Sequence, residues 1–67
     1  MNADTLKGQW HRVKGGVKTQ WGKLTDNDLD QISGQSEKLI GKLQERYGYA
    51  KEQAEREVDD FARLLGP

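Results

Sequence analysis

Apolar side chains recur along this chain every three or four residues, and this spacing predicts helices. No stretch alternates apolar and polar residues as a half-buried strand would. The longest uninterrupted apolar run is two residues, so we expect no membrane-spanning segment. We therefore predict an all-α fold. The three apolar stripes are Leu6, Trp10, Val13, Val17, Trp21 and Leu24; Leu39, Ile40, Leu43 and Tyr47; and Ala50, Ala54, Val58, Phe61 and Leu65.

Thr25 and several glycines mark where helices are expected to begin and end. Thr25 lies three residues before Asp28, which is the spacing of a capping box. Gly15-Gly16 lie inside the first stripe, and we expect a bend or fraying there because each glycine costs about 1 kcal/mol relative to alanine. These signals predict four helices, the last ending near residue 65. Glycines are expected to end the first three helices at Gly22, Gly34 and Gly48, and Gly22 is expected to be left-handed.

Residues 8–32 resemble residues 34–58 at an offset of 26. Four of the 25 aligned pairs are identical, and Trp21 aligns with Tyr47, each directly before a glycine. We infer a duplicated helical hairpin. An αα-hairpin buries only one of its sides, so two copies packed face to face would form a single core. Residues 1–67 are therefore predicted to be one domain of two packed hairpins.

Whether so polar a chain folds depends on its apolar content. Leu, Ile, Val and Phe number 13 of 67 residues, just under the level of about 20% below which disorder is suspected. The mean hydropathy of −1.01 leaves open a partly disordered, hydration-protective protein. Disorder is also associated with a large net charge, and this chain has 11 basic and 11 acidic residues. We therefore favour a folded domain of modest stability.

Charge is distributed unevenly along the chain. Residues 1–23 carry five basic and one acidic side chain, whereas residues 24–67 carry six basic and ten acidic ones. We predict that the basic half binds an unidentified protein partner or the acidic half of a second copy. Nucleic acid is the alternative partner, less favoured because the whole chain is neutral. The candidate interaction surface comprises Lys7, His11, Lys14, Lys18 and Lys23.

The aromatic residues allow two interpretations. Trp10, Trp21, Tyr47 and Tyr49 have flat faces on which bases could stack. Both tryptophans lie on the first apolar stripe, however, so we favour core positions for them. Gly8, Gly15 and Gly22 also share one helix face, which either contacts another monomer or, as we favour, is solvated.

Groups that could support catalysis are scarce. The chain has no cysteine, and its only histidine, His11, has no nucleophile or carboxylate at an obvious triad spacing. No phosphate-binding glycine loop is present. We predict a non-enzymatic protein with no cofactor and no small-molecule substrate.

A calcium loop is the one metal-site pattern in the sequence. Asp26, Asp28, Asp30 and Glu37 occupy positions 1, 3, 5 and 12 of such a loop, but position 6 needs glycine and is Gln31. The same segment also fits a capped helix, which would point the three aspartates in different directions. We favour the helix and expect no metal.

The stretches Trp21-Gly22-Lys23-Leu24-Thr25 and Arg46-Tyr47-Gly48-Tyr49 are distinctive, and with Trp10-His11-Arg12-Val13 they resemble the CsbD-like family of small bacterial general stress-response proteins. The resemblance covers about residues 1–61, and Gly16 departs from the lysine that such proteins often carry. It implies a sterile-alpha-motif-like bundle of two helical hairpins, with no catalytic residues to carry over. A cytoplasmic location is expected, because the start of the chain lacks the basic and apolar regions of a signal peptide.

Overall fold

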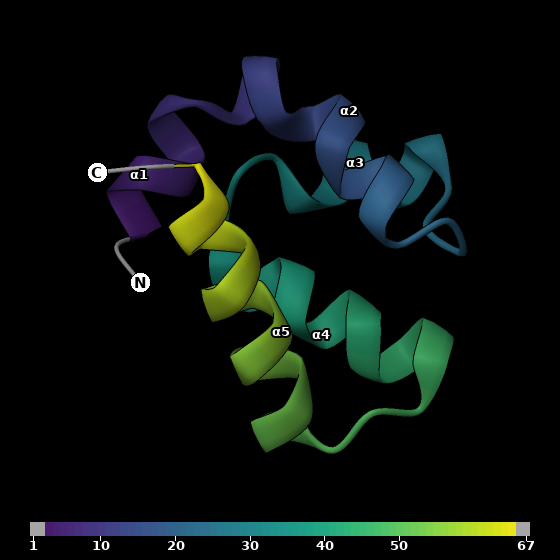
Figure 1. Cartoon of the computed structure of the whole chain (residues 1–67). Helices are drawn as coiled ribbons and strands as arrows, with labels where there is room; N and C mark the ends of the chain where they lie inside the picture. The colour runs from purple at the N-terminus through teal and green to yellow at the C-terminus, as the bar shows by residue number, and fades with distance from the viewer. Residues whose placement is uncertain (1–2, 66–67) are drawn as a thin grey trace.

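Helices account for most of the chain, as the apolar spacing predicts. The computed structural model describes residues 3–65, and within that range it contains helices and no strand (Figure 1). The predicted all-α fold class is confirmed, with five helices in place of four over these residues. The helices are α1 (Ala3–Gly8), α2 (Trp10–Gln20), α3 (Asp26–Ile32), α4 (Ser36–Tyr47) and α5 (Lys51–Leu64).

The first apolar stripe is divided between two helices at Gln9, and the fraying expected at Gly15-Gly16 does not occur. Gln9 leaves helical geometry with φ −109° and ψ 8°, and α2 then runs without interruption through both glycines. Val13 and Val17, one on each side of the glycines, are both buried. Their burial holds α2 together because tertiary packing outweighs the low helix propensity of glycine.

Local hydrogen bonds start and end α3 where the sequence predicts. The Thr25 hydroxyl accepts a hydrogen bond from the Asp28 backbone N–H at 3.0 Å, and the Asp28 carboxylate accepts one from the Thr25 backbone N–H at 3.0 Å. The capping box is therefore confirmed. The helix ends at Ser33, which is already left-handed at φ 46°, and Gly34 follows at φ 81°.

The two remaining glycine stops have opposite outcomes. Gly48 ends α4 as predicted, and the structure shows it in the left-handed conformation at φ 71°. Gly22 is not left-handed, so that prediction is wrong. Instead, α2 ends because Trp21 turns out of the helix at φ −124°. This turn places Trp21 and Leu24 in the core, at 2% and 1% exposure.

The core draws on every helix, and α4 lies at its centre. α4 packs against α1, α3 and α5, and Figure 1 shows α2 and α3 on one side of the molecule with α4 and α5 on the other. The radius of gyration is 10.5 Å, close to the ~11 Å expected for a folded chain of this length. Ala50, predicted as a core residue, is exposed at the start of α5. The core residues are Leu6, Val13, Val17, Trp21, Leu24, Leu29, Ile32, Leu39, Leu43, Ala54 and Val58.

The helix boundaries follow the predicted offset of 26 residues. Shifting α2 by that offset gives 36–46, which lies within α4, and shifting α3 gives 52–58, which lies within α5. Duplication requires that residues 8–32 superpose on residues 34–58 as helical hairpins. The internal repeat therefore stays a prediction.

Candidate interaction surface

The predicted basic surface is partly neutralised within the chain. Lys14 Nζ lies 3.2 Å from Asp30 Oδ1, and Lys18 Nζ lies 2.6 Å from Asp26 Oδ1. The hydrogen bond and charge of Lys18 also hold the pKa of Asp26 below its ordinary value. Two of the basic side chains that suggested an external acidic partner therefore form ion pairs between α2 and α3.

Lys23 contacts an aromatic pair, Tyr47 and Tyr49, through Tyr47. Its ammonium lies 5.0 Å from the centre of the Tyr47 ring, and its backbone N–H donates to the Tyr47 hydroxyl at 3.2 Å. Tyr47 stacks on Tyr49 with ring centres 5.1 Å apart. Burial, with the nearby Glu57 carboxylate, raises the pKa of Tyr49. These contacts tie the turn after α2 to the turn after α4.

Two of the five predicted residues are exposed and have no ion pair or ring contact within the described part of the chain, and both lie where α1 meets α2. Lys7 lies in the last turn of α1 and His11 in the first turn of α2. Arg12 follows His11 in the first turn of α2 and is also exposed, although the predicted surface did not include it. On one continuous helix Arg12 would point about 140° away from Lys7. The break at Gln9 interrupts the helix, so this angle between Lys7 and Arg12 no longer applies. We call Lys7, His11 and Arg12 the junction residues.

The aspartates of the calcium pattern have three different partners, which contradicts a shared metal site. Asp26 and Asp30 pair with lysines of α2, as described above. Asp28 is 1% exposed and receives two hydrogen bonds of 2.9 Å from the Arg46 guanidinium. Lys42 Nζ lies 3.4 Å from the same carboxylate. No cluster of metal-ligating side chains occurs in the described part of the chain.

Arg46 sets the ionisation of Asp28. The pKa of Asp28 lies well below its ordinary value because the Arg46 side chain and then the Thr25 backbone N–H donate to the carboxylate. Asp28 is therefore charged at all physiological pH values, and its contacts join the start of α3 to the last turn of α4. Its part in the molecule is structural.

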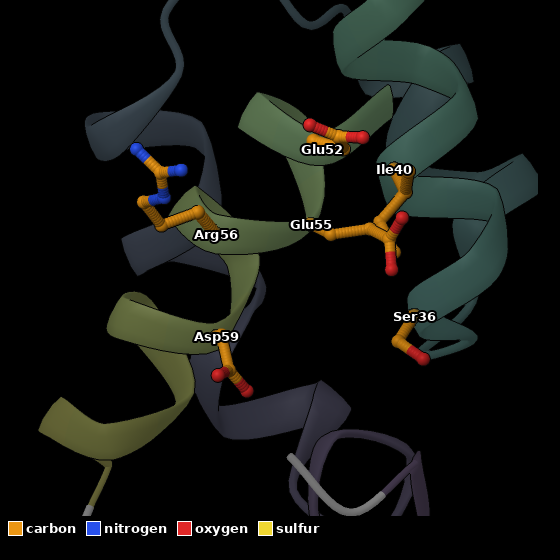
Figure 2. Close-up of a pocket in the computed structure, with 6 residues that line it drawn as sticks. All are labelled: Ser36, Ile40, Glu52, Glu55, Arg56 and Asp59. Atoms are coloured by element: carbon orange, nitrogen blue, oxygen red, sulfur yellow. The ribbon is translucent and has the colours of Figure 1, made fainter. Parts of the chain in front are cut away.

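An acidic groove of about 530 Å³ runs between α4 and α5. Figure 2 shows Glu55 extending from α5 toward Ile40 of α4, with Glu52 above them and Ser36 below. Ile40 is half-buried and Ser36 is buried, whereas Glu52 and Glu55 are exposed. The sequence contains these acids, but nothing in their spacing indicates that they share one groove with α4. The complete lining is Ser36, Ile40, Glu52, Glu55, Arg56 and Asp59.

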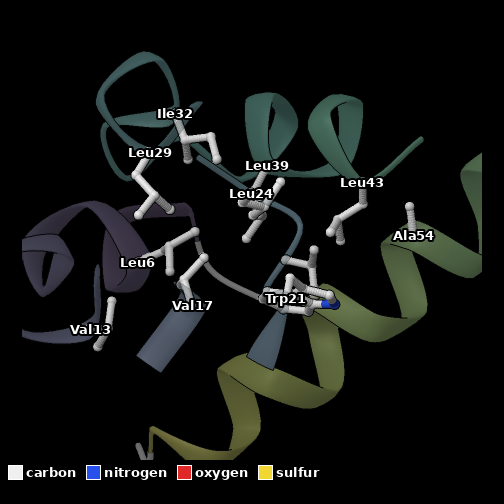
Figure 3. Packing of buried hydrophobic residues seen from close by; sticks show 11 residues of the cluster. Leu6, Val13, Val17, Trp21, Leu24, Leu29, Ile32, Leu39, Leu43 and Ala54 are labelled. Atoms are coloured by element: carbon white, nitrogen blue, oxygen red, sulfur yellow. The ribbon is translucent and has the colours of Figure 1, made fainter. Parts of the chain in front are cut away.

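Trp21 is a core residue and not a stacking platform (Figure 3). Its indole Nε1–H donates to Glu57 Oε1 at 3.0 Å, and its ring packs against Phe61 with centres 5.1 Å apart. Trp10 is half-buried and packs against the same core. The core interpretation of Trp21 is therefore confirmed.

No helix among residues 3–65 is long and apolar enough to cross a membrane.

Comparisons with known proteins identify a family. A family model described as CsbD-like matches residues 4–56. UPF0337 protein pc0632 of Protochlamydia amoebophila is 61% identical over 61 residues, covering 91% of this chain and 92% of the relative. UPF0337 protein PA4738 of Pseudomonas aeruginosa is 55% identical over 65 residues, covering 97% and 100%. UPF0337 protein YjbJ of Escherichia coli K12 is 57% identical over 61 residues, covering 91% and 88%.

Proposed function

This chain belongs to the CsbD-like family of stress-response proteins, and from that premise we propose that it acts in the bacterial cytoplasm without catalysis, by binding a macromolecular partner. Binding is centred on the junction residues. The rest of the chain forms the rigid support that holds them in place.

The observation that carries this proposal is the charge left over after intrachain pairing. Lys7, His11 and Arg12 are exposed, and none forms an ion pair within the part of the chain that the structure describes. Elsewhere, buried polar groups have partners, as Asp28 has Thr25 and Arg46. Unpaired charges gathered at one place on a surface steer and orient macromolecular partners.

A protein partner is favoured over nucleic acid. Lys14 and Lys18 each lie within 3.2 Å of an aspartate, which lowers the positive potential that a phosphate backbone would meet. Trp21 is buried and offers no face to a base. We expect no binding of short duplex DNA in a fluorescence titration at low salt. Salt-sensitive binding that Lys7→Glu weakens would favour nucleic acid instead.

Complementation tests the proposed function. A bacterial strain lacking its own CsbD-like protein would express the wild type, the junction variant Lys7→Glu/Arg12→Glu, or the control variant Lys38→Glu/Lys51→Glu. The control reverses two exposed lysines on α4 and α5 and changes the net charge equally. Circular dichroism and thermal unfolding would first establish that both variants fold.

We expect the wild type and the control variant to restore survival under stress and the junction variant to fail. If the folded junction variant restores survival as well as the wild type does, the junction is not the functional surface.

A further inference from the structure

We propose that the partner of the junction is a second copy of this chain, and that the junction residues of one copy dock in the acidic groove between α4 and α5 of another. The inference rests on the proposed function, because it takes the junction to be the binding surface and names what that surface binds.

The groove is suited to basic side chains. Glu52 and Glu55 are exposed at its edge and form no ion pair among the residues that the structure describes. Half-buried Ile40 gives the groove an apolar wall, against which the methylene stem of a lysine or arginine can lie. Figure 2 shows Arg56, the basic residue of the lining, on the opposite side of α5 from Glu55. The part of the groove that faces α4 is therefore negative.

The charges that remain after intrachain pairing are complementary. On the basic side they include Lys7 and Arg12. Among residues 6–65, the acids that form no ion pair all lie on α4 and α5, and three further basic residues on those two helices are also unpaired. The acids without an ion pair are Glu37, Glu52, Glu55 and Glu57, of which Glu57 accepts hydrogen bonds from Trp21 and Gln53. The further basic residues are Lys38, Lys51 and Arg56.

The two surfaces do not satisfy each other within one molecule. Lys7 and Arg12 form no ion pair with Glu52 or Glu55 of their own chain. When two identical chains contact each other through different surfaces, making the contact twice gives a two-fold pair, and making it head-to-tail gives rings or open chains. Exposed ion pairs are individually weak and screened by salt. The association is accordingly reversible, concentration-dependent and lost at high ionic strength.

Sedimentation velocity of the full chain measures this association. We expect the weight-average sedimentation coefficient to rise with protein concentration at about 0.01 M salt, where the Debye length is about 30 Å, and to stay constant at about 1 M salt, where it is about 3 Å. A wild type that stays monomeric over the whole concentration range at low salt would overturn the proposal.

A charge swap identifies the surfaces. The groove variant Glu52→Lys/Glu55→Lys and the junction variant Lys7→Glu/Arg12→Glu each place like charges on both docking surfaces, so each alone is expected to be monomeric. In an equimolar mixture, every groove meets a junction of opposite charge, and association is expected to return. The control variant Lys38→Glu/Lys51→Glu is expected to associate alone.

Failure of the two folded variants to associate when mixed, or association of either one alone, would overturn the assignment of these surfaces. The proposed function is tested separately. If the junction variant fails in complementation while the wild type is monomeric at low salt, the junction binds a different molecule, and only the self-association proposal falls.

Discussion

The Asp28 carboxylate joins a local and a long-range contact in one side chain. It caps the start of α3 through the Thr25 backbone N–H, and it binds Arg46, which lies 18 residues away on α4. A carboxylate with 1% exposure is stable in its charged form only when such donors surround it.

We expect Asp28→Asn to lower the free energy of unfolding by about 2 kcal/mol, because a neutral amide leaves the cations of Arg46 and Lys42 without their carboxylate. Breaking a buried pair costs about 3–5 kcal/mol in general. The loss here is smaller because the Arg46 side chain is 39% exposed and can regain water. Urea unfolding followed by tryptophan fluorescence measures the change.

The matched control is Asp30→Asn, which removes an equally long carboxylate from an exposed pair. The Asp30 side chain is 70% exposed, so we expect a change below about 1 kcal/mol. Equal losses in the two variants would show that burial of Asp28 is not what gives its contacts their strength.

Acid stability depends on the same residue. Because hydrogen bonds from Arg46 hold the pKa of Asp28 below its ordinary 3.8, the charged carboxylate stabilises the fold at every pH above that value. As the pH falls below about 4, the unfolded state takes up protons that the folded state does not, and stability declines. We expect Asp28→Asn to flatten this decline in urea midpoints measured from neutral to acidic pH. If the stability of the variant declines as steeply as that of the wild type, other carboxylates cause the decline.

At the scale of the helices, glycine in two helix interiors lowers stability without a steric need. Gly15 in α2 and Gly41 in α4 are exposed, and a Cβ added at either position would meet nothing within 4 Å. Both positions are therefore open to alanine.

We expect Gly15→Ala and Gly41→Ala each to raise the free energy of unfolding by about 0.5–1 kcal/mol, because alanine restricts the unfolded chain and favours the helix. Differential scanning calorimetry would register this as a midpoint higher by a few degrees. Gly34→Ala is the contrasting variant: Gly34 has φ 81°, and its added Cβ would lie 2.8 Å from Lys7 Cα, so it should destabilise the fold. If Gly15→Ala instead lowers stability, glycine at this position is required for a reason other than the space around it.

In the molecule as a whole, α4 is the element on which the others depend. It contacts α1, α3 and α5, and its Leu39 and Leu43 are fully buried. α1 is only six residues long and rests on α2 and α4. Opening α4 therefore disrupts most of the core, whereas opening α1 disrupts little.

We expect amide hydrogens in the middle of α4 to exchange most slowly and those of α1 most quickly, because local opening is least costly where few buried contacts are lost. Hydrogen exchange followed by NMR measures this order. Protection of α1 equal to that of α4 would mean that the domain opens only as a single unit.

The sequence by itself determined the family, the all-helical class and most of the core. It also determined the stops and starts that depend on adjacent residues. The Thr25–Asp28 capping box and the left-handed Gly48 follow from hydrogen bonds and backbone conformations within a few residues, and such interactions are the same in any fold.

Only the tertiary structure decided which charges remain at the surface. Lys14 pairs with Asp30, which is 16 residues away in the sequence, and Arg46 pairs with Asp28, which is 18 residues away. These ion pairs form only because α2 and α4 pack against α3. The same holds for the division at Gln9 and for the end of α2 at Trp21, where burial of side chains overrode the glycine signals. Helical periodicity specifies which side chains turn inward, but the partner of each polar group depends on where the other helices pack.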